Sequence, residues 1–106
     1  MLRIYPVVLE TLQELRALIV QIERRDSDLT RQLRRCAASI ALNLGEGMYS
    51  RGRIRAARYH NALGSAREVL SCLEVACALG YIAPLDEALV AKLNRVIGTL
   101  VRLVAA

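Results

Sequence analysis

The sequence lacks the residue patterns that define the common small enzymes and metalloproteins. It contains one histidine, His60, and no Cys-x-x-C pair among its three cysteines. One histidine without a nucleophile elbow does not support a hydrolase triad. The Glu-x-x-His pattern that builds metal sites in helical bundles is also missing. We therefore expect no catalytic residues, no metal site and no cofactor.

Long apolar runs are missing as well. The longest run without a charged residue is 75–85, shorter than the ~20 apolar residues that span a bilayer. The opening residues, MLRIYPVVLETLQE, reach an acid and a proline too early for a secretory signal. We expect a cytoplasmic protein with no membrane partner. The odd set of cysteines fits this expectation, and we predict that Cys36, Cys72 and Cys77 are small buried side chains.

Arginine supplies nearly all of the positive charge in this sequence. The chain has fourteen arginines and one lysine against ten acidic residues, giving a net charge of +5. Its 106 residues predict a single domain, 1–106. The apolar fraction is 55%, against roughly 45–50% in ordinary soluble domains. This excess favours a subunit interface.

Helical periodicity runs through the chain, and no segment alternates as a strand would. Asp28 is predicted to cap the second helix, Gly80 to end the third, and Pro84 to open the fourth. The connections are short, so neighbouring helices should be antiparallel. The sequence predicts an all-α, up-down-up-down four-helix bundle with helices at 7–25, 29–48, 53–79 and 85–104.

The third predicted helix carries a second stripe of mostly small residues beside its core seam. A glycine within a helix costs about 1 kcal/mol relative to alanine, so Gly64 indicates that another backbone approaches closely. Together with the apolar excess, this stripe predicts a symmetric homo-oligomer with an interface that contains Ala57, Gly64, Ser71, Val75 and Ala78.

The segment Gly47-Met-Tyr-Ser-Arg-Gly52 resembles a phosphate loop but follows a helix and lacks the required Lys and Ser/Thr. We interpret it as a turn between helices two and three. Asn43 and Glu46 precede it, and no second carboxylate is near in sequence to divide acid and base roles. We predict that Asn43, Glu46 and Gly47 are structural, with Glu46 accepting hydrogen bonds from an arginine such as Arg58 or from backbone donors.

Seven arginines lie between residues 31 and 58, with Glu46 as the only acid among them. The planar arginine fork suits phosphate, and such a cluster favours binding to RNA or DNA. Tyr49 and Tyr59 have rings suited to stacking on bases, although Tyr59 lies on the core seam. The alternative is a solvated face, partly structural at Arg34 and Arg35. The predicted nucleic-acid surface comprises Arg31, Arg34, Arg35, Arg51, Arg53, Arg55 and Arg58.

Two segments carry a family resemblance: "LTRQLRRCAASIALNLGEG" and "YHNALGSAREVLSCLEVACALGYI". They resemble the four-helix-bundle proteins encoded in intervening sequences of bacterial 23S ribosomal RNA genes, a family that includes the accessory variability determinants of diversity-generating retroelements. The resemblance covers residues 29–82, and Gly45 replaces the usual alanine. It implies a non-enzymatic bundle that forms a ring-like homopentamer. Its best-understood branch binds nucleic acid beside a reverse transcriptase.

Two functions therefore remain open from the sequence. The first is a basic scaffold that binds nucleic acid and assists a reverse transcriptase or another nucleic-acid enzyme. The alternative is a purely structural module that assembles proteins and has no nucleic-acid role. A small enzyme of the bundle type has the least support, because the residues it would need are missing.

Overall fold

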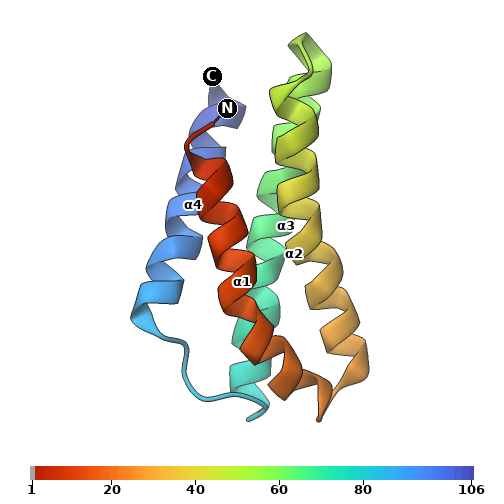
Figure 1. Cartoon of the computed structure of the whole chain (residues 1–106), viewed down its shortest axis with the longest axis vertical. Helices are drawn as coiled ribbons and strands as arrows, with labels where there is room; N and C mark the ends of the chain where they lie inside the picture. Colours follow the sequence, from red (N-terminus) through yellow and green to blue (C-terminus); the bar gives the residue numbers. More distant parts are fainter. Residues whose placement is uncertain (1) are drawn as a thin grey trace.

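The protein is an antiparallel bundle of four helices, described here by a computed structural model for residues 2–106. Within this range the helices are α1 (Ile4–Glu23), α2 (Ser27–Met48), α3 (Gly52–Ala78) and α4 (Glu87–Ala105), and there is no strand. Successive helices run in opposite directions, which brings both ends of the chain to one end of the bundle (Figure 1). The predicted all-α, up-down-up-down bundle is confirmed.

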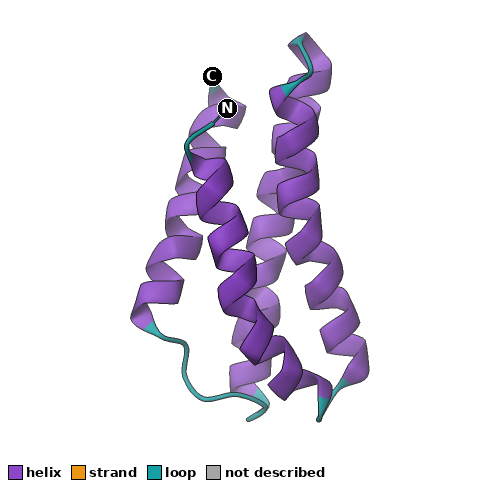
Figure 2. Cartoon of the chain, in the orientation of Figure 1, coloured by secondary structure: helices purple, strands orange, loops and turns teal. Residues whose placement is uncertain are grey.

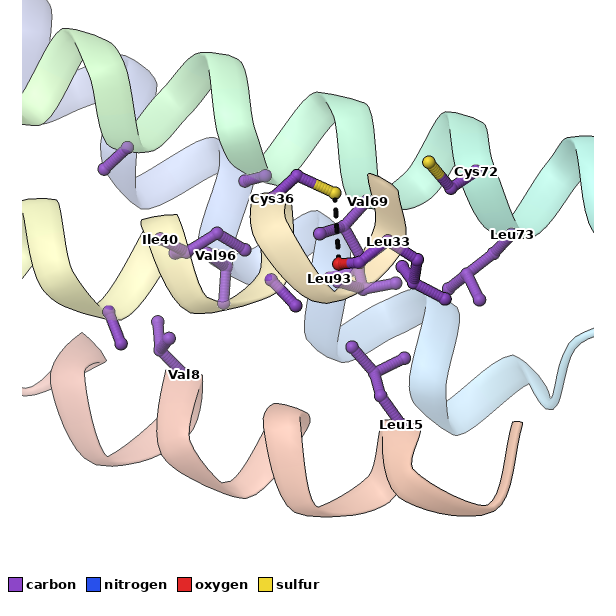
Figure 3. Packing of buried hydrophobic residues seen from close by; sticks show 14 of the residues in the cluster. Val8, Leu15, Leu33, Cys36, Ile40, Val69, Cys72, Leu73, Leu93 and Val96 are labelled. Atoms are coloured by element: carbon purple, nitrogen blue, oxygen red, sulfur yellow. Dashed lines mark hydrogen bonds between the residues drawn. The ribbon is translucent and has the colours of Figure 1, made fainter. Parts of the chain in front are cut away.

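The core lies between all four helices. Each helix packs against two neighbours, in the ring order α1, α2, α3, α4. Figure 3 shows leucines from every helix pointing into the shared interior, and Leu15, Leu33, Leu73 and Leu93 are at most 1% exposed. Burying such a side chain contributes about 1.5–3 kcal/mol, so this layer ties the four helices into one unit.

The cysteines divide between the core and its edge. Cys36 and Cys72 are buried, as predicted, whereas Cys77 is partly exposed. Its Sγ lies 3.4 Å from the Ala83 carbonyl in the α3–α4 connection. Burial, together with nearby Cys72 and Glu68, raises the pKa of the Cys36 thiol to about 12. Cys36 therefore stays protonated at neutral pH and behaves as a small apolar side chain.

Two of the predicted helix-capping residues are wrong. Asp26, and not Asp28, caps α2, because its carboxylate accepts a hydrogen bond of 2.9 Å from the Leu29 N–H. Pro84 does not open α4, since it lies in the connection from α3 (Figure 2). Asp86 is the residue that caps α4, accepting from the Ala88 N–H at 3.0 Å. Both errors place a helix start two residues from its true position. The predicted start of the first helix at 7 is wrong by three residues, since α1 begins at Ile4.

The predicted end of α3 is correct to within a residue. Gly80 adopts a φ of +75° directly after the helix. The Gly80 N–H then donates to the Cys77 carbonyl at 3.0 Å, and the Tyr81 N–H donates to the Ala76 carbonyl at 2.9 Å. These two bonds satisfy carbonyls that the end of a helix otherwise leaves free.

The α2–α3 hairpin projects beyond the rest of the bundle. Its turn is shorter than the predicted 47–52, because α2 continues to Met48 and α3 begins at Gly52, which has a φ of +56°. Figure 1 shows this turn extending past both chain ends. We call residues 49–58 the hairpin tip. No helix in residues 2–106 has the combination of length and hydropathy needed to cross a bilayer.

Candidate nucleic-acid interface

A line of polar side chains joins α2 to α3 along the outside of the bundle. Gln32 Nε2 donates to Glu68 Oε2 at 2.9 Å. Further along, Ser65 Oγ donates to Ser39 Oγ at 2.8 Å, and Asn43 Nδ2 donates to the same oxygen at 2.9 Å. These bonds fix the register of the two helices that form the projecting hairpin. Asn43 is therefore a structural contact in this seam.

The upper end of the seam is an ion pair. Arg58 Nε lies 2.9 Å from Glu46 Oε2, and Arg58 Nη1 lies 3.5 Å from Asn43 Oδ1. The predicted contact between Glu46 and an arginine is present, with Arg58 as its partner. Both side chains are about half exposed, so the pair adds only modest stability. Its larger effect is to neutralise the one acidic side chain next to the tip.

Gly47 lies in the helix and allows α2 and α3 to approach each other. It is buried, and a Cβ at this position would lie 2.5 Å from Cε1 of Tyr59. The Tyr59 ring is itself in the core, with 6% exposed, which removes it as a base-stacking candidate. The sequence marked Gly47 as part of a turn, and the structure shows a packing position.

The three arginines in the first part of α2, which we call the lower group, are largely compensated by acids. Arg31 lies 3.3 Å from Asp28, and Arg34 pairs with Glu23 of α1. Arg35 has no ion pair with residues 2–106, but it lines a groove with Asp28 and Glu68. The sequence missed this neutralisation, because Glu23 and Glu68 come from α1 and α3 and lie outside the arginine-rich segment.

The arginines of the hairpin tip remain largely uncompensated. Arg51 and Arg53 are exposed and form no ion pair with any residue in the range 2–106. Arg55 is also exposed, and its Nε donates to the Gly47 carbonyl at 3.2 Å. Because Glu46 pairs with Arg58, the tip carries an excess of positive charge. The lower group is roughly 20 Å away along α2, at about 1.5 Å per residue.

The predicted interface stripe lies on the outer surface of α3. A Cβ added at Gly64 would meet no atom within 4 Å, so the close approach that the sequence suggested at Gly64 does not occur within the chain. His60 is exposed on the same helix. All five stripe residues are exposed: Ala57, Gly64, Ser71, Val75 and Ala78.

The geometry defines a small all-helical bundle protein with a polar seam along its central hairpin and a basic tip. The model of the 23S rRNA-intervening sequence protein family matches residues 3–102, and the chain therefore belongs to this family. The resemblance to the 23S rRNA intervening-sequence proteins is confirmed over nearly the whole chain. Searches of curated proteins and of solved structures found no match.

Proposed function

We propose that the protein is a non-enzymatic scaffold that binds RNA or DNA through its hairpin tip. The observation that carries this proposal is the pair Arg51 and Arg53, which are exposed on a projecting turn and have no acidic partner in residues 2–106. A phosphate chain would supply the missing negative charge, and it would release its own counterions on binding. No base-reading element is evident, so this binding has little sequence preference.

The cellular setting of this scaffold is a further part of the proposal. The resemblance to accessory variability determinants of diversity-generating retroelements supports a role beside a reverse transcriptase or another nucleic-acid enzyme. In this role the bundle holds the nucleic acid in the cytoplasm, and the partner enzyme performs the chemistry.

The test compares two double variants that lose the same formal charge. Arg51→Ala/Arg53→Ala removes the free tip arginines. Arg16→Ala/Arg95→Ala removes exposed arginines from α1 and α4, which also lack an ion pair within residues 2–106. Arg55 and Arg58 are left in place because they hold Gly47 and Glu46.

Fluorescence anisotropy with labelled duplex at several salt concentrations measures the affinity. We expect the tip variant to bind more weakly. The slope of log K against log salt should become shallower by about 0.9 for each phosphate that the variant no longer neutralises. The control variant should change the affinity much less. Equal losses in both variants would show that only net charge matters and that the tip is a solvated face.

An assembly role is the second candidate, supported by the exposed small-residue stripe on α3. Such a face allows helices of neighbouring copies to approach closely, and the family resemblance favours a ring-like homopentamer. Multi-angle light scattering should give a multiple of the 11.7 kDa chain mass. Gly64→Leu should lower this mass and preserve the helical content, because the space around Gly64 is open within the chain. A parent mass of one chain would contradict the assembly.

A further inference from the structure

Among residues 2–106, the three most exposed large apolar side chains line one groove. Tyr49 is 87% exposed, Leu42 66% and Ile54 63%. All three border a groove of about 560 Å³ beside the hairpin tip. Single exposed apolar residues are ordinary on protein surfaces, but a cluster of them marks a binding site. The groove therefore gathers the most exposed large apolar side chains of residues 2–106 beside the hairpin tip.

The walls of this groove come from three helices. Leu42 and Gly45 lie on one side of α2, and Tyr49, directly after the helix, borders the groove next to them. Ile54 borders the groove from α3, and Tyr5 borders it from α1. A Cβ at Gly45 would lie 3.9 Å from Cε1 of Tyr5. The Tyr5 ring therefore packs against α2 at Gly45, where the helix has no side chain.

Two tyrosines, Tyr5 and Tyr49, thus line this groove, and Tyr49 is the exposed one. The other two tyrosines are committed elsewhere. Tyr59 is buried in the core. Tyr81 packs under Arg25, with Cζ 5.5 Å from the ring centroid, and its hydroxyl lies 3.3 Å from Asp26. Aromatic surface that is open to a ligand is therefore concentrated beside the arginine-rich tip.

The charges around the groove favour a polyanionic ligand. Glu46 and Arg58 both line it, and they neutralise each other across 2.9 Å. Arg51 and Arg53 follow Tyr49 within a few residues in the hairpin tip. A ligand that fills the groove and also contacts the tip must present flat apolar groups beside negative charge. Unpaired bases on a phosphate backbone have this combination, whereas the bases of a duplex are stacked on one another.

We infer that the groove binds unpaired bases of single-stranded nucleic acid. Tyr49 stacks on a base over the apolar floor, and the tip arginines hold the adjoining phosphates. This inference rests on the proposed function and adds the form of nucleic acid that the site prefers. Stacking tolerates every base, because each base has an aromatic face. The preference is therefore for an open strand and not for a sequence.

The experiment measures the affinity of the full chain for three labelled probes of equal length. The probes are an unstructured single strand, a duplex, and a strand with abasic sites that keeps its phosphates but lacks bases. The protein variants are Tyr49→Leu, which keeps an apolar side chain without a ring, and Tyr49→Phe, which keeps the ring. Tyr49 is so exposed that both variants should fold, and thermal melting checks this.

We expect the parent to bind the single strand most tightly. Tyr49→Leu should weaken single-strand binding by about 5- to 150-fold, the range for removing one stack between a base and an aromatic ring. Binding to the duplex and to the abasic strand should stay within about twofold under the same change, because those probes offer no free base to the ring. Tyr49→Phe should retain most of the single-strand affinity.

The other outcomes overturn the inference in distinguishable ways. If Tyr49→Leu leaves all three affinities unchanged, or lowers them equally, the ring does not contact bases, although the arginine-based proposal stands. If the parent binds none of the probes, the proposed function fails, and this inference fails with it. If Tyr49→Leu lowers the oligomer mass in light scattering, a second copy of the chain occupies the groove.

Discussion

Gly45 and Gly47 lie two residues apart near the end of α2, yet their surroundings differ. A Cβ at Gly47 would lie 2.5 and 2.8 Å from two carbons of the Tyr59 ring, whereas the nearest atom to a Cβ at Gly45 would be 3.9 Å away. Since Tyr59 is buried, its ring has little room to move. The single hydrogen of Gly47 is therefore a packing requirement.

We expect Gly47→Ala to destabilise the protein by about 1–3 kcal/mol, the usual cost of overpacking a core. Gly45→Ala is the matched control. It should be neutral or stabilise by up to about 1 kcal/mol, because alanine is the better helix former. Urea denaturation of the parent and both variants measures the difference. Similar effects in the two variants would contradict the close contact with Tyr59.

The start of α2 provides a test at the scale of the helix. Asp26 accepts from the Leu29 N–H, and its second oxygen lies 3.3 Å from the Tyr81 hydroxyl. Asp28 is exposed, and within residues 2–106 its side chain pairs with Arg31 alone. We expect Asp26→Ala to cost about 0.5–2 kcal/mol, as the loss of a cap does. Asp28→Ala should cost less than about 1 kcal/mol, through a surface ion pair and the helix dipole.

Thermal or urea unfolding of the two alanine variants compares the two aspartates directly. If Asp28→Ala lowers the free energy of unfolding more than Asp26→Ala does, Asp28 is the capping residue, as the sequence predicted. Asp26→Asn is a useful addition, since asparagine is also a good cap. It should recover most of the stability that Asp26→Ala loses.

These elements show which parts of the structure the sequence determines locally. Helix interiors and the Gly80 stop could be predicted, because apolar spacing and a glycine in the left-handed region act within a few residues. The choice between Asp26 and Asp28 could not, because both are good capping residues. The compensation of Arg34 by Glu23 was equally hidden, since it depends on the packing of α1 beside α2.

In addition to the core packing, a single lysine links α1 and α4 through ion pairs. Lys92 Nζ of α4 lies 2.7 Å from Glu14 and 3.7 Å from Glu10 of α1. The hydrogen bond to Glu14 raises the pKa of Lys92 above its ordinary value of 10.5. Its stabilising contribution is complete below pH 10.5 and is lost as the pH rises through the higher folded-state value.

We therefore expect the free energy of unfolding to fall as the pH rises above the ordinary lysine pKa of 10.5. Tyr81 adds to this fall, because burial and Asp26 raise its pKa above the ordinary value of 10.0. In Lys92→Met the fall should be smaller, since the titrating ammonium is gone. Urea midpoints at pH 8 and at high pH measure the change. An identical alkaline loss in the parent and in Lys92→Met would exclude Lys92 as its source.

At this scale the topology was predictable and the surface was not. Short connections between four amphipathic segments leave few arrangements other than an antiparallel bundle. The groove beside the tip depends on Tyr5, Tyr49 and Ile54, which come from different helices. Of these, only Tyr49 attracted attention in the sequence, as an aromatic residue among arginines. Tyr5 lies far from the other two in the sequence, and only the packing of the helices brings the three side chains to one groove.

Only two helices meet in the hairpin tip, and every residue from 51 to 57 is exposed. Few buried contacts there resist a local opening, whereas opening further down the hairpin uncovers the four-helix core. The backbone of the tip can therefore loosen and re-form while the core stays closed. A single strand bound as proposed would then meet a tip that adjusts to its path, carried on a core that keeps its shape.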